Sequence, residues 1–180
     1  MHPYRMQQLI KERGKDQVIN VRRRAGLYQT ISQLLKAGLI RVQATGRAEG
    51  FPERTIYELT AEGHRTAIDW MRQMISTPGD EFPEFPAAIS LLPLLTPDDA
   101  RHQMELREAA LAGRIDAMDR AVEEYAQELP RLFLLEEELV RTTLLAELTW
   151  VRGVIADLAG GALTWNDDWI KGYLPDDDTQ

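Results

Sequence analysis

Residues 20–43, NVRRRAGLYQTISQLLKAGLIRVQ, carry the pattern that decides the fold of this 180-residue chain. Apolar side chains recur there at three- and four-residue steps, the period of a helix with one buried stripe: Leu27, Ile31, Leu34 and Leu35. Gly38 is a typical helix terminator, and residues 39–43 then alternate between apolar and polar side chains as a strand does. The stretch therefore predicts a helix from about Asn20 to Ala37 that leads directly into a strand.

The flanking segments add a helix before this stretch and a second strand after it. Residues 1–13 have the pattern of a helix, which Gly14 ends. Residues 45–54, TGRAEGFPER, contain two glycines and a proline and predict a loop. Residues 55–59 alternate again, so we expect them to pair with the first strand as a hairpin.

A further helix follows the hairpin. Thr60 is a good N-cap, with Gly63 at the position where a full capping box has Glu. The helix places four apolar side chains on one side, of which we expect the two methionines to fill the core: Ile68, Met71, Met74 and Ile75. Helix, helix, strand, loop, strand, helix is the order of a winged helix-turn-helix with a small β-hairpin wing.

Basic and polar side chains lie where that fold meets DNA. Arg22, Arg23 and Arg24 open the second helix, whose first residues a recognition helix presents to the major groove. Arg47 and Arg54 belong to the hairpin loop, within reach of phosphates or a minor groove. Further along the same helix, exposed polar side chains are able to hydrogen-bond to base edges: Gln29, Thr30, Ser32 and Gln33.

Charge divides the chain into two halves. Residues 1–76 hold 13 of the 21 Lys and Arg residues of the chain but only 7 of its 29 Asp and Glu residues. The first half is therefore basic and the second half acidic, within a net charge of −8 for the whole chain. A polyanion is therefore attracted by the first half and repelled by the second. The alternative is that the two halves are simply two differently solvated surfaces.

The second half predicts a helical arm. Residues 77–86, TPGDEFPEFP, contain three prolines and a glycine and mark a boundary. We expect a winged-helix DNA-binding domain over residues 1–76, a linker with a short apolar segment over 77–95, and a helical dimerisation domain over 96–180. Thr96, followed by Pro97 and two acidic residues, starts the first helix of the arm.

A heptad-like row on that helix and a broad apolar face on the last helix, residues 131–159, favour a homodimer. Pro130 separates the two helices, and Gly160 and Gly161 end the second one. Two helices alone leave much of this apolar surface uncovered, and a two-fold dimer matches a palindromic operator. The expected dimer contacts are Leu111, Ile115, Met118, Val122, Leu144, Leu148, Val151 and Ile155.

The sequence resembles the PadR family of bacterial transcriptional regulators. The segments that carry the resemblance are residues 2–4 (HPY), 25–28 (AGLY), 37–40 (AGLI), 54–63 (RTIYELTAEG), 85–88 (FPAA), 91–95 (LLPLL) and 147–152 (ELTWVR). The resemblance implies a homodimeric repressor, with Tyr28 and its neighbours close to DNA and with small aromatic or lipophilic compounds as effectors that release it.

The sequence departs from the family pattern in three places. Two of them affect the expected DNA contacts, and the third affects how the apolar side chains of the first domain are buried. Gln29 stands where the family commonly has proline, and residues 33–35 (QLL) replace the usual Arg-Leu-Glu. Family members have another helix before HPY, which suggests a start assigned too late or a shortened chain. We then expect the apolar side chains around Leu9, Leu27 and Ile31 to lose cover.

Enzyme chemistry finds little support in the sequence. The chain has no cysteine, no Gly-rich phosphate loop and no serine in a nucleophile elbow. Residues 136–138 (EEE) point in different directions on a helix, so we expect a solvated surface and no metal or other cofactor. The lack of a leader or a long apolar span indicates a cytoplasmic protein without a membrane association.

Two interpretations remain open at this stage. Trp150, Trp165 and Trp169 either line a flat apolar ligand pocket or belong to ordinary packing. A second class of function is a helical protein-interaction adaptor that keeps a winged helix without using it on DNA. Salt-sensitive binding to the promoter of its own gene distinguishes this adaptor from a DNA-binding regulator.

Overall fold

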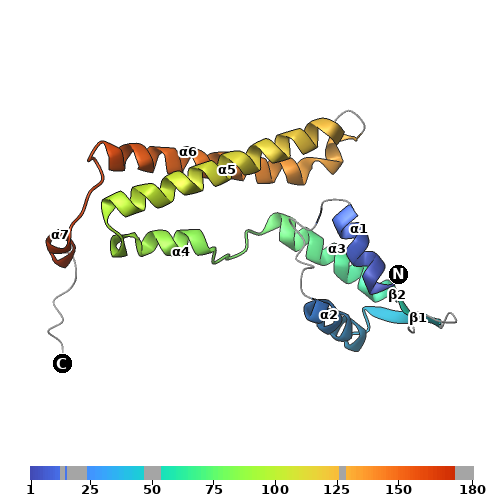
Figure 1. Ribbon diagram of the computed structural model, residues 1–180. Helices are drawn as coiled ribbons and strands as arrows, with labels where there is room; N and C mark the ends of the chain where they lie inside the picture. Colours follow the sequence, from blue (N-terminus) through green and yellow to red (C-terminus); the bar gives the residue numbers. More distant parts are fainter. Residues whose placement is uncertain (13–14, 16–23, 47–53, 126–128, 173–180) are drawn as a thin grey trace, which may run out of the picture. The chain divides into compact units, whose positions relative to one another are not determined.

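A computed structural model describes residues 1–12, 15, 24–46, 54–125 and 129–172 (Figure 1). The chain divides into two compact units, Met1–Glu81 and Phe82–Gln180. Each unit is described by itself below.

The first unit has the predicted winged-helix order. It contains α1 (Pro3–Glu12), α2 (Arg24–Lys36), β1 (Ile40–Gly46), β2 (Arg54–Leu59) and α3 (Ala61–Ser76). The two strands form an antiparallel hairpin from the pair Ile40–Leu59 to the pair Gly46–Arg54, with an irregularity between Val42 and Ala44. Thr45, Gly46 and Arg54 thus belong to the strands, although the sequence predicts them in the loop. The predicted stop at Gly14 and the predicted start of α2 near Asn20 lie outside the described residues.

The start of α3 fastens this helix to the end of α2. The Thr60 hydroxyl accepts a hydrogen bond from the Gly63 N–H at 2.9 Å, which confirms the N-cap, and donates to the Gly38 carbonyl at 2.8 Å. Gly38 has a φ of +69°, the left-handed conformation that glycine adopts without steric cost at a helix end. The cap residue of α3 therefore also satisfies a carbonyl at the turn that follows α2.

The apolar face of α3 is more exposed than the sequence predicts. Met71 and Met74 are 53% and 66% exposed, so the expectation that they fill the core is wrong. A helical period places them on one face, but none of the described elements covers that face. Ile31 of α2, in contrast, is buried, and Leu9 and Leu27 are half-buried, so the expected loss of cover does not extend to Ile31.

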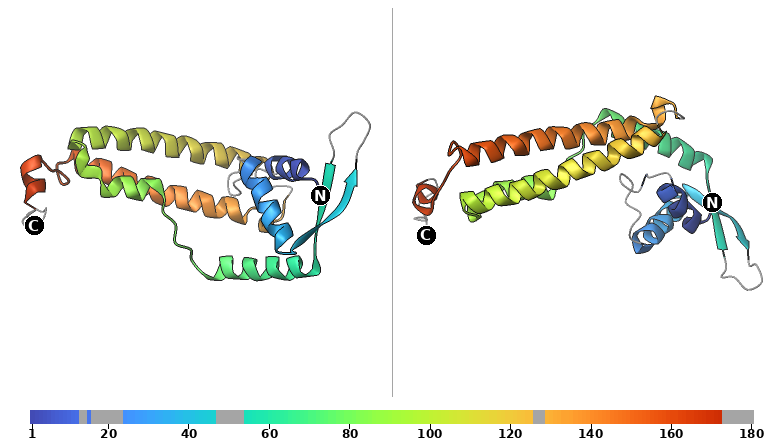
Figure 2. Two further views of the ribbon diagram at one scale, coloured as in Figure 1. Left: turned by 90° about the horizontal axis from the view of Figure 1, so that it is seen from below. Right: turned by 45° about the horizontal axis from the view of Figure 1, so that its top comes forward.

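The second unit is built on a long helical hairpin of α5 (Pro97–Tyr125) and α6 (Leu135–Ala159), which run side by side in every view (Figures 1 and 2). The Asp99 N–H donates to the Thr96 hydroxyl at 3.2 Å, as expected for the helix start. The predicted last helix starts later than expected, since residues Arg131–Phe133 form the 3₁₀ turn η3. It ends at Ala159 with Gly160 as its C-cap, as predicted, and Gly161 has a φ of +73°.

Two short helical segments pack on this hairpin before α5 begins. They are α4 (Glu84–Ser90) and the 3₁₀ turn η2 (Leu92–Leu94), and both lie in the segment expected as a linker. Phe85, Ile89 and Leu92 pack against the buried cluster of the hairpin. The buried cluster consists of Met104, Leu111, Ile115, Leu144, Leu148 and Val151. The short helix α7 (Asp167–Lys171) follows the hairpin.

Ion pairs connect α5 and α6 along the outside of this cluster. Arg141 binds Asp119 with two hydrogen bonds of 2.5 and 2.9 Å, and Arg152 donates to Glu108 at 2.7 Å. In the part of the chain that the structure describes, no helix is both long and apolar enough to span a bilayer.

The glutamate run at the start of α6 is only partly the solvated surface that the sequence predicts. Glu138 is exposed and forms two hydrogen bonds with Arg131, each of 2.9 Å, whereas Glu136 and Glu137 are half-buried. Within the described ranges, no cluster of three or more His, Cys, Asp or Glu side chains is able to hold a metal ion.

Candidate nucleic-acid interface

Helix α2 has a packed face and an open polar face. Ile31 is 6% exposed on the packed face, and Leu27, Leu34 and Leu35 are half-buried beside it. Four candidate DNA-contacting side chains of α2 are exposed: Tyr28, Gln29, Ser32 and Gln33. Tyr28 is 56% exposed although it is a large aromatic residue. The sequence therefore gives the orientation of the helix correctly, with its hydrogen-bonding side chains open to solvent.

The end of α2 is held in place by backbone hydrogen bonds. The Leu39 N–H donates to the Leu34 carbonyl and the Gly38 N–H to the Leu35 carbonyl, both at 3.0 Å. This pattern closes the helix in a Schellman-like turn, and the Thr60 hydroxyl holds the carbonyl of the turn glycine. The open face of α2 is therefore carried on a helix whose end is fixed to both β1 and α3.

Most of the predicted basic contacts lie outside the described residues. Arg22, Arg23 and Arg47 belong to those segments. Arg24 is the first residue of α2, as the sequence predicts for a side chain at the helix start. Arg54 pairs with Gly46 at the end of the hairpin next to the loop. The structure thus gives the backbone positions of Arg24 and Arg54, at the helix start and at the base of the loop.

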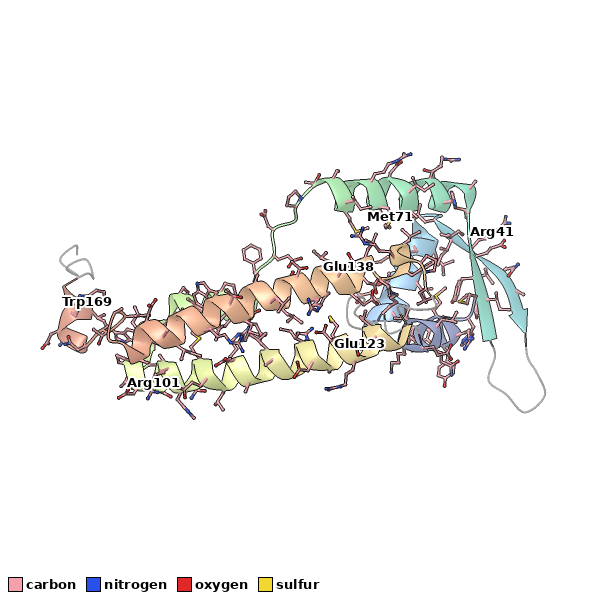
Figure 3. The ribbon with its side chains drawn as sticks, turned by 90° about the horizontal axis from the view of Figure 1, so that it is seen from above. Arg41, Met71, Arg101, Glu123, Glu138 and Trp169 are labelled. Atoms are coloured by element: carbon pink, nitrogen blue, oxygen red, sulfur yellow. The ribbon has the colours of Figure 1, made fainter. Side chains whose placement is uncertain are left out.

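Lys36 is a candidate contact that the sequence reasoning missed. It follows Tyr28 and Ser32 at four-residue steps, so it lies on the same open face of α2, and it is exposed. The repeating spacing of four was the signal in the sequence. Arg41 on β1, labelled in Figure 3, is a weaker candidate because its guanidinium binds Glu58 at 2.5 Å.

The open face of α2 combines the groups that read and hold a duplex. Amide and hydroxyl side chains donate and accept hydrogen bonds at base edges, and the lysine adds a positive charge for a phosphate. The Thr30 hydroxyl is less available as a donor because it donates to the Gly26 carbonyl at 2.9 Å. The arrangement fits recognition of a groove.

Seven of the eight predicted dimer contacts, all except Val122, pack in the interior of the hairpin within one chain. Leu111, Ile115, Leu144, Leu148 and Val151 are at most 7% exposed in the cluster between α5 and α6. Met118, Val122 and Ile155 are half-buried. The heptad-like row thus meets a partner helix, and that helix is α6 of the same chain. A role for these residues against a second chain stays a prediction.

The fold of this chain has counterparts among solved structures. Bacillus subtilis PadR in complex with operator DNA matches with a TM-score of 0.70 and 16% sequence identity, over 88% of this chain and 91% of that chain. The chain has the PadR fold. PadR from the same organism in complex with p-coumaric acid matches with a TM-score of 0.68 and 15% identity, over 88% and 90% of the two chains.

A more distant match to the PadR fold is the Vibrio cholerae virulence activator AphA, with a TM-score of 0.56 and 17% identity, over 75% of this chain and 77% of that chain. A family model or a curated protein that matches the sequence was not found. PadR from Bacillus subtilis and the PadR-like protein BC1756 from Bacillus cereus, which share this fold, are transcriptional regulators.

Proposed function

We propose that this protein is a cytoplasmic, DNA-binding transcriptional regulator that represses its target genes and is released by a small aromatic or lipophilic effector. The observation that carries the proposal is the open polar face of α2 within a fold that matches PadR bound to operator DNA. The match to PadR bound to p-coumaric acid supports an aromatic effector.

The proposed contacts fall into two classes. Arg22, Arg23, Arg24, Arg47 and Arg54 neutralise phosphates and hold the protein on the duplex. Tyr28, Gln29, Ser32 and Gln33 read base edges, with Lys36 as an additional phosphate contact. The excess of basic residues over residues 1–76 favours association with a polyanion.

A homodimer completes the proposed regulator, since two copies of α2 fit the two halves of a palindromic operator. The supporting observation is the apolar surface that the hairpin leaves open. Leu135, Leu139 and Trp150 of α6 are 46%, 68% and 47% exposed. These side chains supplement the predicted contacts of the heptad-like row as candidates for the dimer interface.

The test is binding to the promoter of the protein's own gene, measured by fluorescence anisotropy over a range of salt concentrations. Replacing Arg23 or Arg47 with Ala should weaken binding to every duplex and lower the salt slope by about 1. Replacing Gln29 or Gln33 with Ala should change the preference between promoter variants, because a base contact is lost.

Arg72→Ala is the matched control. Arg72 is an exposed arginine of the same unit that pairs with Asp69 on α3, so its loss removes one positive charge outside the proposed interface. We expect Arg72→Ala to retain the affinity of the wild type. Absence of binding at low salt would contradict the proposal and favour the adaptor.

A further inference from the structure

The second unit contains an apolar pocket beyond the start of the hairpin. It has a volume of about 230 Å³ and is lined by Ile89, Leu92, Pro93, Leu163, Thr164, Trp165 and Trp169. Trp169 lies at the end of the hairpin where Arg101 lies in the first turns of α5, and Glu123 and Glu138 lie towards the other end (Figure 3). The pocket is thus built by η2 with the end of α4 on one side, and by α7 with the segment before it on the other.

Two hydrogen bonds hold the indole-bearing wall of the pocket in place. The Trp165 indole N–H donates to the Leu95 carbonyl at 2.8 Å, which ties the segment after the hairpin to the residue that follows η2. The backbone N–H of Trp169 donates to the Asn166 side-chain oxygen at 2.8 Å, and this bond caps α7. The Trp165 ring and the backbone of α7 are therefore held in place, so a ligand that enters orders few further groups of the protein.

The lining also defines the chemistry of the occupant. None of the seven side chains carries a charge, so a buried carboxylate or ammonium group would lack a countercharge from the lining. Aromatic rings favour edge-to-face or offset contacts with an indole. The Thr164 hydroxyl is a polar group of the wall that is able to bind a ligand hydroxyl.

The volume limits the occupant to a small molecule. An engineered apolar cavity of about 150 Å³ binds benzene, so this pocket has room for one ring with a small substituent.

We propose that this pocket binds a neutral, single-ring aromatic molecule. Binding itself does not depend on the DNA-binding role; that the molecule acts as the effector rests on the proposed function. Because ligand binding is measured on the full chain without DNA, failure of one proposal is distinguishable from failure of the other.

The experiment compares 4-methylphenol, which is neutral at pH 7, with 4-hydroxybenzoate, which has the same phenol ring but carries a carboxylate. Calorimetry and ligand-observed NMR on the full chain measure both affinities. We expect 4-methylphenol to bind at least tenfold more tightly than 4-hydroxybenzoate. Equal affinities, or a preference for the anion, would overturn the assignment to a neutral ligand.

Two variants test the location. Leu163→Trp should fill the pocket and Trp169→Ala should remove one wall, and each should weaken 4-methylphenol binding at least tenfold. Leu94→Trp is the matched control, because Leu94 is 81% exposed and outside the lining. Circular dichroism verifies that each variant is folded. Unchanged affinity in Leu163→Trp and Trp169→Ala would place the ligand elsewhere.

Absence of 4-methylphenol binding to the wild-type chain would overturn the proposal.

Discussion

Gly63 is confined by the backbone of the residue that precedes β1. A Cβ atom added to it would lie 1.9 Å from the Leu39 carbonyl oxygen and 2.8 Å from the Leu39 carbonyl carbon. Glu at this position would complete the capping box with Thr60, but its Cβ would occupy the same space. The close approach of α3 to the Leu39 backbone therefore explains why the third residue after the cap, residue 63, is a glycine.

Replacing Gly63 with Ala should lower the free energy of unfolding by about 2 kcal/mol or more, because the backbone has to shift to accept the methyl group. Gly26→Ala is the matched control in the same unit, since Gly26 is a helical glycine of α2 with no atom within 4 Å of its added Cβ. It should raise stability by about 0.5–1 kcal/mol. Urea unfolding of both variants measures the two effects, and equal stabilities would contradict the steric argument.

Asp119 of α5 and Arg141 of α6 form an ion pair with consequences for acid stability. The hydrogen bonds from the Arg141 guanidinium lower the pKa of the Asp119 carboxyl below its ordinary value of 3.8. Because the pKa of this carboxyl is lower in the folded than in the unfolded state, the ion pair stabilises the fold at pH values above the unfolded pKa. This contribution is lost as the pH falls through the folded pKa, because the carboxylate becomes protonated.

A double-mutant cycle of Asp119→Asn and Arg141→Gln isolates this pair. The coupling free energy should be present at pH 7 and should fall towards zero as the pH is lowered from about 4 to about 2. Urea unfolding at several pH values provides the measurement. A coupling that is as large at pH 2 as at pH 7 would show that the ionised carboxylate is not its source.

At the scale of elements, α4 is attached to the hairpin by an aromatic and cationic cluster. The Phe85 ring meets the Trp150 ring edge-on with centroids 5.9 Å apart. The Arg107 guanidinium lies 3.3 Å from the centre of the Phe85 ring and also binds Glu147 of α6. This cluster joins α4 to both α5 and α6, so the segment expected as a linker ends in a packed helix.

Phe85→Ala should release α4 from the hairpin and lower the free energy of unfolding by about 2 kcal/mol, since the half-buried ring loses its apolar and cation–π contacts. Hydrogen exchange of the amides of α4 and η2 should become faster. Phe85→Leu keeps the apolar volume and should retain most of the protection. Unchanged exchange in Phe85→Ala would show that other contacts hold α4.

The open face of α2 and the packing of α4 differ in how well the sequence predicted them. The open face of α2 was predictable because a period of 3.6 places Gln29, Ser32 and Gln33 away from Ile31 without any knowledge of neighbours. The packing of α4 was not predictable, because the segment around Phe85 contains three prolines and a glycine and therefore has the composition of a linker. What makes Phe85 part of a packed element is contact with Arg107 and Trp150, which are distant in the sequence.

At the scale of the whole molecule, the proposed dimer depends on apolar side chains that stay open after the hairpin has formed. Leu139 is 68% exposed on α6. Leu139→Glu should weaken self-association at least tenfold, because a charge would be buried without a partner in an apolar contact. Sedimentation equilibrium measures the association, and circular dichroism should show an unchanged helix content.

Ala117→Glu is the control, since Ala117 is an exposed residue of α5 in the same unit and receives the same charge. It should leave the association constant unchanged. A dimer that survives Leu139→Glu but dissociates in Ala117→Glu would move the interface to α5. A wild-type chain that sediments as a single subunit at all concentrations would contradict the dimer.

The sequence by itself determined the order of the elements, the cap at Thr60 and the polar face of α2. These features follow from local periodicity and from hydrogen bonds between residues close in the chain. Tertiary structure decided which apolar surfaces are used up: Leu148 packs within one hairpin, whereas Met74 stays exposed. An apolar stripe specifies that a helix face favours a partner, but identical stripes pack against the same chain or stay open, and only the three-dimensional arrangement distinguishes them.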